Sequence, residues 1–359
     1  MSDIPSLKTR IAIMGFSTVV TALACEGLIR IVDGNATPMI RLFEADKAGH
    51  IHLQASAQAR IARANGQPWE INTDPDGRRV STSPVSPQSW IAVGDSQVMG
   101  NGVSDETNFP AQLMLDGSGV HNLGVPGYGI GDSLWAATQH LDEHPAAGVI
   151  VVVNQMNDWE EVARPVGDRY RVRGGWLIDA DDADTARGRF LASPLSRSHL
   201  AFLIGHLALK DRSTAAPPAP KWMLDPVSMR HSTALFANAI RAFSDAHPGV
   251  RILPVYLPAD VYAAQDRADK SPLSSHLKML PTPPWEDTQL RDQVMTAMAE
   301  FNPIDLTPVL SEAHHFLEGD YHLSESGHKA VADAITTAVL RAPDSDESAS
   351  PAPEKQPPN

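Results

Sequence analysis

Cysteine is almost absent from the sequence, with Cys25 as its single instance in 359 residues. No disulfide can therefore form within the chain, and a zinc or iron–sulfur site built from several cysteines is excluded. Basic residues are also scarce, because 29 lysines and arginines stand against 43 aspartates and glutamates and give a net charge of −14. A protein that follows nucleic-acid phosphates needs a basic surface, so we expect no nucleic-acid partner.

Hydrophobic residues are plentiful by contrast. They make up 42% of the chain and charged residues 20%, a composition that buries a sizeable core and excludes a wholly disordered or fibrous protein. The length fits either about two domains or one α/β domain with extensions. We expect disorder in the tail, residues 342–359, which is rich in Pro, Ser, Asp and Glu.

One long apolar segment lies near the N-terminus, from Ile11 to Val32, and is interrupted by Glu26 and Arg30. It has about 22 residues, which as a helix would be about 33 Å long and would cross a hydrocarbon core. The two charged residues stand four positions apart and can pair at the membrane interface. Basic residues precede the segment, so residues 1–32 are predicted to be a membrane anchor whose N-terminus stays in the cytoplasm.

Two other fates of the same segment stay open. Ala22-Leu23-Ala24 has the A-x-A pattern of a signal-peptidase site, so residues 1–32 also fit a cleaved signal peptide. Cys25 follows directly and suggests a lipoprotein signal, although such signals prefer leucine where Ala22 stands. All three interpretations place the rest of the chain outside the cytoplasm, in the periplasm or at the cell surface if the protein is bacterial.

Short apolar runs alternate with helical patterns in the rest of the chain. Strands are predicted at 90–93, 120–123, 148–153, 250–257 and 302–306, and helices at 107–115, 133–141, 232–246, 288–300 and 326–340. This alternation predicts an α/β fold in which helices cover both faces of a parallel sheet. Ligands of such sheets bind beyond the carboxyl ends of the strands. Residues 33–87, the lead-in segment, are expected to pack against this main domain.

Polar residues and glycines follow the first three predicted strands. A Gly-Asp-Ser sequence ends at Ser96, which would present its hydroxyl at a helix N-terminus. A glycine-rich turn that contains Gly127 follows the second strand, and Asn157 follows the third. A backbone N–H and a side-chain amide at these places can donate hydrogen bonds to an oxyanion. Each pattern alone is equally typical of an ordinary cap or turn.

A histidine with neighbouring carboxylates stands near the C-terminus, in the sequence Glu318-Gly319-Asp320-Tyr321-His322. A neutral imidazole can accept the proton of a serine, and a carboxylate beside it fixes the tautomer and stabilises the imidazolium. In their order and their placement at strand ends, these blocks resemble the SGNH hydrolase family, the GDSL-type esterases and lipases. The segment Val103–Pro110 is also similar to members that carry an N-terminal membrane anchor.

The resemblance implies a flavodoxin-like three-layer α/β/α sandwich with a five-stranded parallel sheet in the order 2-1-3-4-5. The domain would span residues 88–341 and carry an insertion at about 164–222. Ser96 would be the nucleophile, His322 the base and Asp320 its acidic partner. The N–H groups of Ser96 and Gly127 and the amide of Asn157 would form the oxyanion hole. Neither a metal nor an organic cofactor is required.

Two departures from the family pattern concern the third and last blocks. Gln155 stands where the third block usually has glycine, and Asp320 lies two residues before His322 instead of three. Glu318 therefore stays an alternative acidic partner. His328 stays an alternative base.

The expected function is that of a serine esterase that hydrolyses O-acyl esters, such as O-acetyl esters, outside the cytoplasm. Its substrate would be a small-molecule or glycan ester, and the sequence indicates no protein partner. An O-acyltransferase acting on an envelope glycan would use the same residues. A non-catalytic module that binds a glycan or a protein is a further alternative, which the two departures favour.

Overall fold

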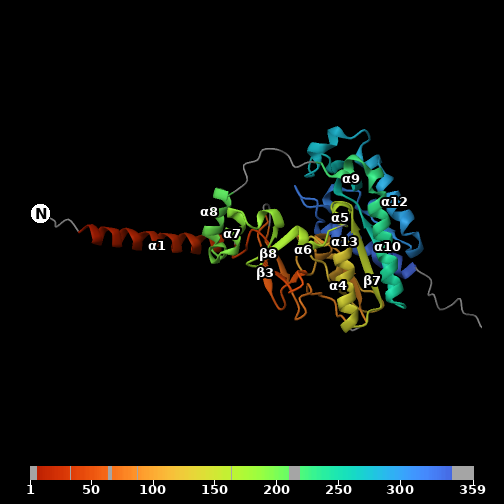
Figure 1. The fold of residues 1–359 in the computed structure, drawn as a ribbon, viewed down its shortest axis with the longest axis horizontal. Helices are drawn as coiled ribbons and strands as arrows, with labels where there is room; N and C mark the ends of the chain where they lie inside the picture. The colour runs from red at the N-terminus through yellow and green to blue at the C-terminus, as the bar shows by residue number, and fades with distance from the viewer. Residues whose placement is uncertain are drawn as a thin grey trace, which may run out of the picture.

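A computed structural model describes residues 6–32, 34–63, 67–86, 88–162, 164–209 and 219–341. The predicted disordered tail, residues 342–359, lies outside the described residues. Figure 1 shows a long N-terminal helix that projects from one end of a rounded α/β body. The functional residues predicted from the sequence all belong to this body.

A five-stranded parallel sheet forms the centre of the body. Its strands are β5 (Trp90–Val93), β6 (Val120–Asn122), β7 (Gly148–Asn154), β10 (Arg251–Leu257) and β11 (Ile304–Asp305). They lie in the order β6-β5-β7-β10-β11, which is 2-1-3-4-5 when the five are counted along the chain. The five strands coincide with the five predicted runs, and the predicted flavodoxin-like fold class is confirmed.

Helices cover both faces of the sheet. Alternate residues of β5 face opposite clusters: Ile91 and Val93 pack with one set of helices, and Trp90 and Ala92 with the other. The first set consists of α4 (Ile130–Glu143), α10 (Arg230–Ala246) and α12 (Gln289–Ala297), and the second includes α3 (Phe109–Gln112) and α13 (Glu325–Arg341). All seven residues of β7 are buried, as its run of β-branched residues predicts for a strand covered on both sides.

The helix predicted at 107–115 is shorter in the structure, where α3 spans only four residues. Its N-terminus is set by Asn108, whose side chain accepts a hydrogen bond from the N–H of Ala111. Its C-terminus is set by Leu113, which has an extended backbone. The remaining short helices of the body are α2 (Ser96–Met99), α11 (Asp260–Ala263), η3 (Pro226–Met229), η4 (Gln265–Arg267), η5 (Ser274–Met279), η6 (Pro284–Glu286), η7 (Ala299–Phe301), η8 (Thr307–Leu310) and η9 (Ala313–His315).

The lead-in segment forms two small antiparallel sheets that the sequence did not predict. One pairs β1 (Phe43–Ala45) with β2 (Ile51–Leu53), and the other pairs β3 (Gln58–Ile61) with β4 (Trp69–Asn72). Strands of three or four residues carry too little alternation to be recognised from sequence. Ile51 and Ile71 are buried in a cluster with Met99 and Tyr128 of the body, so the segment packs on the body through an apolar contact.

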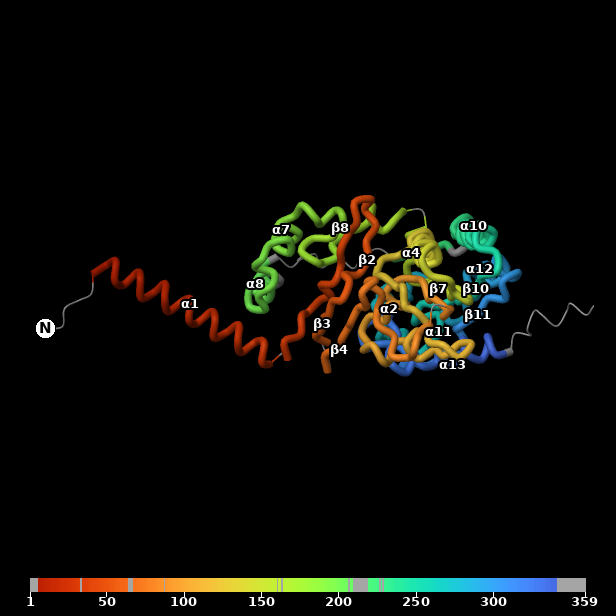
Figure 2. Tube along the Cα trace, turned by 90° about the horizontal axis from the view of Figure 1, so that it is seen from below, coloured from red at the N-terminus to blue at the C-terminus, as the bar shows by residue number. Residues whose placement is uncertain are grey.

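The inserted region has its own small core. α5 (Asp158–Glu161) precedes it, and it contains α6 (Val166–Arg169), β8 (Tyr170–Arg173), β9 (Trp176–Asp179), η1 (Ala180–Asp182), α7 (Ala186–Ala192), η2 (Pro194–Arg197), α8 (His199–Leu209) and α9 (Lys221–Leu224). β8 and β9 pair as an antiparallel hairpin, and Trp176, Ile178, Leu191 and Phe202 pack together behind it. Figure 2 shows α7 and α8 between the N-terminal helix and the body.

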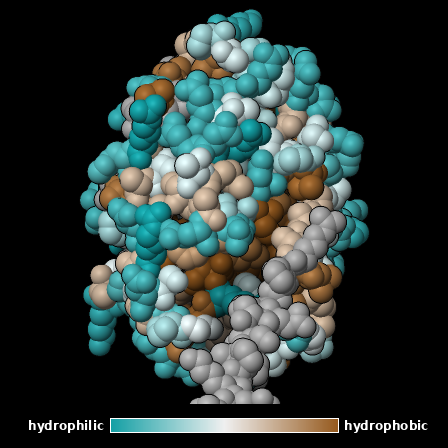
Figure 3. Space-filling view, turned by 90° about the vertical axis from the view of Figure 1, so that its right-hand side faces the viewer, coloured by the Kyte–Doolittle hydropathy of each residue, from teal (hydrophilic) through white to brown (hydrophobic). Residues whose placement is uncertain are grey.

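The N-terminal helix, α1, runs from Leu7 to Val32 as a single helix of 26 residues. It contains no buried residue, and within the described part of the chain it is the one helix long and apolar enough to cross a membrane. The face of the body opposite to α1 has a different character, since hydrophilic residues cover most of it and hydrophobic ones gather in its hollowed centre (Figure 3).

Arg79 fastens the lead-in segment to the loop that follows α2. Its guanidinium is fully buried and donates to Asp105 over 2.7 Å. It also donates to the carbonyl oxygens of Met99, Gly100 and Val103 over 2.6–2.7 Å. One side chain therefore satisfies several acceptors of a loop that has no regular structure of its own.

Replacing Arg79 with leucine should destabilise the protein strongly. The change leaves Asp105 buried without its partner, and breaking a buried pair in this way costs about 3–5 kcal/mol. The matched control is Lys329→Leu, whose pairing with Asp333 is largely exposed and is expected to contribute less than about 1 kcal/mol. Thermal unfolding of the detergent-solubilised full chain measures both, and equal midpoints for the two variants would contradict the role given to Arg79.

Candidate active site

Ser96 begins α2 directly after β5, at the carboxyl end of the sheet. The turn between strand and helix needs Gly94, because a Cβ there would lie 2.4 Å from a methyl group of Val98. Asp95 accepts a hydrogen bond from Nδ2 of Asn154 at the end of β7, over 2.8 Å. These contacts hold the Ser96 hydroxyl above the sheet edge, where the side chain is almost fully buried.

His322 and Asp320 lie next to Ser96. Nε2 of His322 is 2.8 Å from Oγ of Ser96, and Nδ1 is 2.7 Å from Oδ1 of Asp320. Burial would raise the pKa of Asp320, but hydrogen bonds from His322 and its charge outweigh burial and lower that pKa below its usual value. With Nδ1–H donating to the carboxylate, Nε2 carries the lone pair that can accept the Ser96 proton, and Nδ2 of Asn101 lies 3.3 Å from it.

Gln97 sets the distance between the serine and the histidine. Its side-chain Nε2 donates to the carbonyl of Tyr321 over 3.1 Å, and its Oε1 accepts from the N–H of Leu323 over 3.1 Å. These two residues flank His322, so one amide next to Ser96 grips the backbone on both sides of the imidazole. The ring of Tyr321 also stacks on the imidazole with centroids 4.5 Å apart.

The two alternatives from the sequence have other surroundings. Glu318 is exposed, and no hydrogen bond links it to His322 among the described residues. His328 is fully buried, and its Nδ1 accepts from the N–H of Phe109 over 3.2 Å. Burial, with smaller contributions from neighbouring cations, lowers the pKa of His328 to about 3. His328 is therefore a packing residue of the second helical layer.

Gly127 lies in the loop that follows β6, at the same edge of the sheet as Ser96. Its φ of +84° favours glycine, and a Cβ there would be 2.8 Å from the ring of Tyr170. The N–H of Val125 donates to the carbonyl of Gly94 over 3.1 Å, which ties this loop to the end of β5. The Gly127 carbonyl accepts from the guanidinium of Arg169, so residues of the insertion cover the outer side of the loop.

Asn157, at the end of β7, has its amide engaged by a carboxyl group. Nδ2 donates to Oε2 of Glu161 over 2.9 Å, whereas Oδ1 is buried and finds no partner in the described part of the chain. Glu161 also pairs with Arg169 over 2.7 Å. Burial raises the pKa of Glu161 to about 8 in spite of the Arg169 charge, and the nearby Asp95 raises it further.

The places of Glu161 and Arg169 beside Asn157 and Gly127 were not predicted from the sequence. Glu161 stands four residues after Asn157, a spacing at which helical side chains meet, so its contact had a weak signal. Arg169 had none, because its position depends on how the insertion folds back over Gly127.

Gln155, the first departure from the family pattern, has a structural role. Its Oε1 accepts from the hydroxyl of Tyr256 over 2.8 Å and from the N–H of Ala259 over 3.0 Å. The side chain is therefore committed to the end of β10 and fully buried there. The second departure, the short spacing between Asp320 and His322, still brings the carboxylate within hydrogen-bond distance of Nδ1.

A polar cavity of about 510 Å³ opens beside Asn157. Its walls come mostly from the insertion and carry both charges: Met156, Asn157, Glu161, Arg164, Arg169, Tyr170, Asp179, Ala180, Asp181, Asp182 and Pro220. Such a lining suits a hydroxylated ligand better than a long acyl chain. No cluster of histidine, cysteine and carboxylate side chains with the geometry of a metal site occurs within the described ranges.

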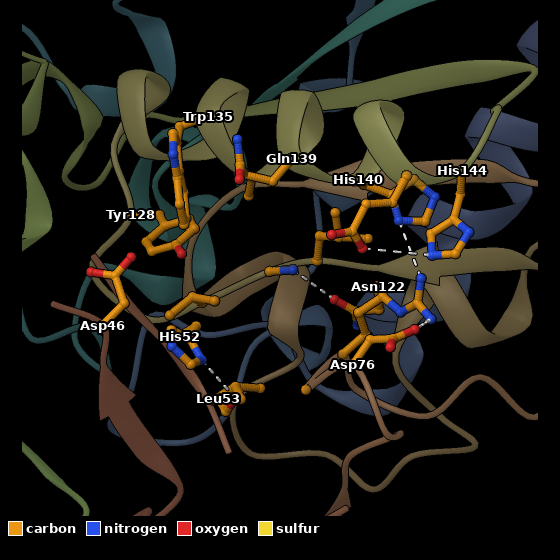
Figure 4. Close-up of a pocket in the computed structure, with 17 residues that line it drawn as sticks. Asp46, His52, Leu53, Asp76, Asn122, Tyr128, Trp135, Gln139, His140 and His144 are labelled. Carbon is orange, nitrogen blue, oxygen red and sulfur yellow. Dashed lines mark hydrogen bonds and ion pairs between the residues drawn. The ribbon is translucent and has the colours of Figure 1, made fainter. Parts of the chain in front are cut away.

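A second cavity, of about 410 Å³, lies between the lead-in segment and α4 (Figure 4). Asp46 and His52 face Trp135 across it, and His140 lines its other end. Nδ1 of His140 is 3.2 Å from the guanidinium of Arg78, and burial with neighbouring cations lowers the pKa of His140 to about 3. None of the predicted site residues lines this cavity, so we do not assign it to the candidate active site.

No family model and no curated protein matches the chain. Solved structures with a similar arrangement include a protein described as lipolytic and of the G-D-S-L family from Desulfitobacterium hafniense DCB-2, at 14% identity, TM-score 0.34 and coverage of 70% of this chain and 98% of that one. A lipase/acylhydrolase from Enterococcus faecalis has 14% identity, TM-score 0.33 and coverage of 70% and 95%. LAE5, an alpha/beta hydrolase enzyme from the metagenome of Lake Arreo, Spain, has 10% identity, TM-score 0.36 and coverage of 71% and 96%.

At these identities and TM-scores, the similarity to solved structures supports no conclusion about this chain. Its fold is established instead by its own strand order. The chemistry likewise has to be argued from its own side chains. These offer a buried hydroxyl beside an imidazole that a carboxylate orients, which is the arrangement of an activated serine nucleophile.

The two carboxylates near His322 make a matched test. Asp320→Asn should slow covalent labelling of Ser96 by a fluorophosphonate on the order of 10²- to 10⁴-fold, because the imidazole loses the group that fixes its tautomer. Glu318→Gln should label at the wild-type rate, since Glu318 is exposed. The rate of probe incorporation, followed by gel fluorescence, decides between them, and a slow Glu318 variant beside a fast Asp320 variant would reverse the assignment.

Proposed function

We propose that the protein is a serine esterase that hydrolyses O-acyl esters through an acyl-enzyme. The observation that carries this proposal is the line of hydrogen bonds from Ser96 through His322 to Asp320. His322 takes the Ser96 proton as Oγ attacks the ester carbonyl, and Asp320 stabilises the imidazolium. The proton then passes to the leaving alcohol. Water attacks the acyl group, His322 accepts a proton from it, and Ser96 is regenerated when that proton returns to Oγ.

The negative oxygen of each tetrahedral intermediate is held by the N–H groups of Ser96 and Gly127 and by the amide of Asn157. Each of these donors, correctly placed, contributes on the order of 10²–10³ in rate. The left-handed backbone at Gly127 supports this assignment, and the N–H of Gly127 donates to no other described residue. The contact between Asn157 and Glu161 makes the third donor dependent on the state of that carboxyl group.

The substrate is an ester of a hydroxylated alcohol, either a small molecule or an O-acylated glycan such as an O-acetylated one. The charged and polar cavity beside Asn157 supports this choice, since it accepts hydroxyl groups that donate to its carboxylates or accept from its arginines. The same cavity favours O-acyltransfer as a second candidate, in which a glycan hydroxyl takes the place of water.

The non-catalytic alternative has lost its main support. The two departures that favoured it were Gln155 and the short spacing before His322, and each has an explanation in contacts. Gln155 bonds to Tyr256 and Ala259, and Asp320 reaches the imidazole.

The domain works outside the cytoplasm, held at the membrane by α1. The length and composition of α1 and the basic residues before it support this location. In a bacterium the compartment would be the periplasm or the cell surface.

Replacing Ser96 with alanine tests the esterase directly. The detergent-solubilised full chain should hydrolyse p-nitrophenyl acetate, and Ser96→Ala should lose at least about 10³-fold in kcat because the acyl acceptor is gone. Equal turnover by the two proteins would remove Ser96 from the mechanism. Mass analysis of products made from p-nitrophenyl acetate with and without an oligosaccharide acceptor that has free hydroxyl groups separates hydrolysis from transfer.

The ionisation of Glu161 should produce an alkaline limb in the pH profile of the activity. An ionised Glu161 accepts from one of the two N–H groups of Asn157 and places a negative charge beside the amide that would hold the oxyanion, which disfavours the charge of the tetrahedral intermediate. A protonated Glu161 is neutral and does not oppose the negative charge that the second N–H of Asn157 would stabilise. The charged and titratable groups around Glu161 are Arg169, Asp95, Asp132, Asp158, Tyr170 and Tyr321. The pKa of about 8 means that the carboxyl group is mostly protonated at neutral pH.

Wild-type kcat/KM for p-nitrophenyl acetate should therefore fall as the pH rises through about 8, the value to which burial raises the pKa of Glu161. Glu161→Gln has no proton to lose, so its profile should stay flat from about pH 7 to about pH 9.5. Glu318→Gln, an exposed carboxyl replaced in the same way, should keep the wild-type fall. An alkaline limb that persists in Glu161→Gln would assign it to another group.

A further inference from the structure

The end of α1 is joined to α8, a short helix of the insertion. Oε1 of Glu26 accepts from the N–H of His199 over 3.1 Å, and Oε2 accepts from the N–H of Leu200 and the hydroxyl of Ser198, each over 2.8 Å. Arg30 pairs with Glu26 over 2.7 Å. The carboxylate of α1 thus caps the N-terminus of α8, and the two helices lie in contact there (Figures 1 and 2).

The length of α1 places this junction at the depth of the bilayer. The uninterrupted apolar run from Ile11 to Cys25 has about 15 residues and as a helix covers about 22 Å. A hydrocarbon core is about 30 Å thick, so about five more residues of α1, as far as Arg30, have to lie within it or at its edge. Glu26 is one of them. A carboxylate at this depth needs partners, and it has Arg30 and the N–H groups of α8.

α8 carries an exposed apolar face beside this junction. Leu203, Ile204 and Leu207 are 47%, 58% and 64% exposed, and their spacing puts them on one side of the helix. Phe202 lies on the other side, where it packs on Trp176 in the small core of the insertion. The core of the insertion therefore leaves this face of α8 uncovered, next to a helix that contains no buried residue.

Arginines gather at the same end of the molecule, although the chain as a whole is acidic. Arg41, Arg60 and Arg197 line a cavity of about 710 Å³ that also includes Gly34 and Asn35, just beyond the end of α1. Arg60 pairs with Glu70 over 3.6 Å. Within the described ranges neither Arg41 nor Arg197 forms an ion pair with a carboxylate. Guanidinium groups just beyond the end of a membrane-spanning helix can pair with the phosphates of anionic lipid headgroups.

We propose that α8 is a second membrane-contacting element, which lies in the leaflet from which α1 emerges and turns Leu203, Ile204 and Leu207 toward the acyl chains. Anionic headgroups then face Arg41 and Arg197. The inference rests on the membrane-spanning role of α1 in the proposed function. It adds that the domain contacts the bilayer surface through α8. With α1 alone, the domain would be attached to the membrane but not held against it.

The same inserted region also covers the candidate active site. Its Tyr170 ring lies beside Gly127, its Arg169 donates to the Gly127 carbonyl, and its helix α8 contacts α1. Seating through α8 thus sets the height of the cavity beside Asn157 above the membrane. A substrate attached to, or synthesised at, the membrane surface would meet the site at that height.

Fluorescent labelling of the full chain in lipid vesicles tests the inference. In a Cys25→Ser background, which removes the single cysteine, an environment-sensitive NBD probe is attached to Leu207→Cys, to Val19→Cys in α1, or to Met279→Cys on the body, a residue 58% exposed. The vesicles contain phosphatidylcholine with about one quarter phosphatidylglycerol and a doxyl-labelled quencher lipid. Hydrolysis of p-nitrophenyl acetate verifies that each labelled protein is folded.

We expect blue-shifted, doxyl-quenched emission from positions 207 and 19, and water-like, unquenched emission from position 279. Quenching at 19 with water-like emission at 207 overturns the seating through α8 and leaves the anchor intact. Water-like emission at both positions overturns the anchor as well. Quenching at 207 that is equally strong in pure phosphatidylcholine contradicts the part assigned to Arg41 and Arg197.

Discussion

The hydrogen bond from Ser96 to Nε2 of His322 spans 226 positions of sequence and 2.8 Å of space. The sheet alone cannot hold such a distance, because Ser96 follows its first strand and His322 lies in a loop before the last helix. Gln97 provides the missing restraint, since its amide bonds to the backbone on both sides of His322. Arg267 adds another from below, where it pairs with the buried Asp260 and donates to the carbonyl of Asp320 over 2.5 Å.

The insertion joins two parts of the molecule that the sheet keeps apart. At one end it lies over Gly127 with Tyr170 and Arg169, and at the other it receives Glu26 of α1 at the N-terminus of α8. The carboxylate of Glu26 and the N–H groups of α8 satisfy each other's hydrogen bonds. In a hydrocarbon environment either group would be left without a partner if the other were absent. The rim of the candidate site and the end of the N-terminal helix therefore belong to one connected region of the chain.

The sheet was predictable strand by strand, because a run such as Gly148–Asn154 is β-branched and buried on both faces, and its composition alone indicates that environment. The placement of Ser96, Gly127 and Asn157 at one edge followed from the same rule, since parallel strands end on the same side. The lead-in segment was not predictable, because strands of three or four residues depend on contacts with Met99 and Tyr128 for their burial.

Local patterns in the sequence were enough to predict the α/β order of elements, the apolar length of α1 and the candidate residues for acyl transfer. These properties are local, since they follow from periodicity, composition and strand ends. The folded chain was needed to learn that Asp320 and not Glu318 lies against His322, that Gln155 bonds to Tyr256, and that Glu161 engages Asn157. Each of those choices depends on which groups are buried together. Burial is a property of the whole fold, and no window of neighbouring residues contains it.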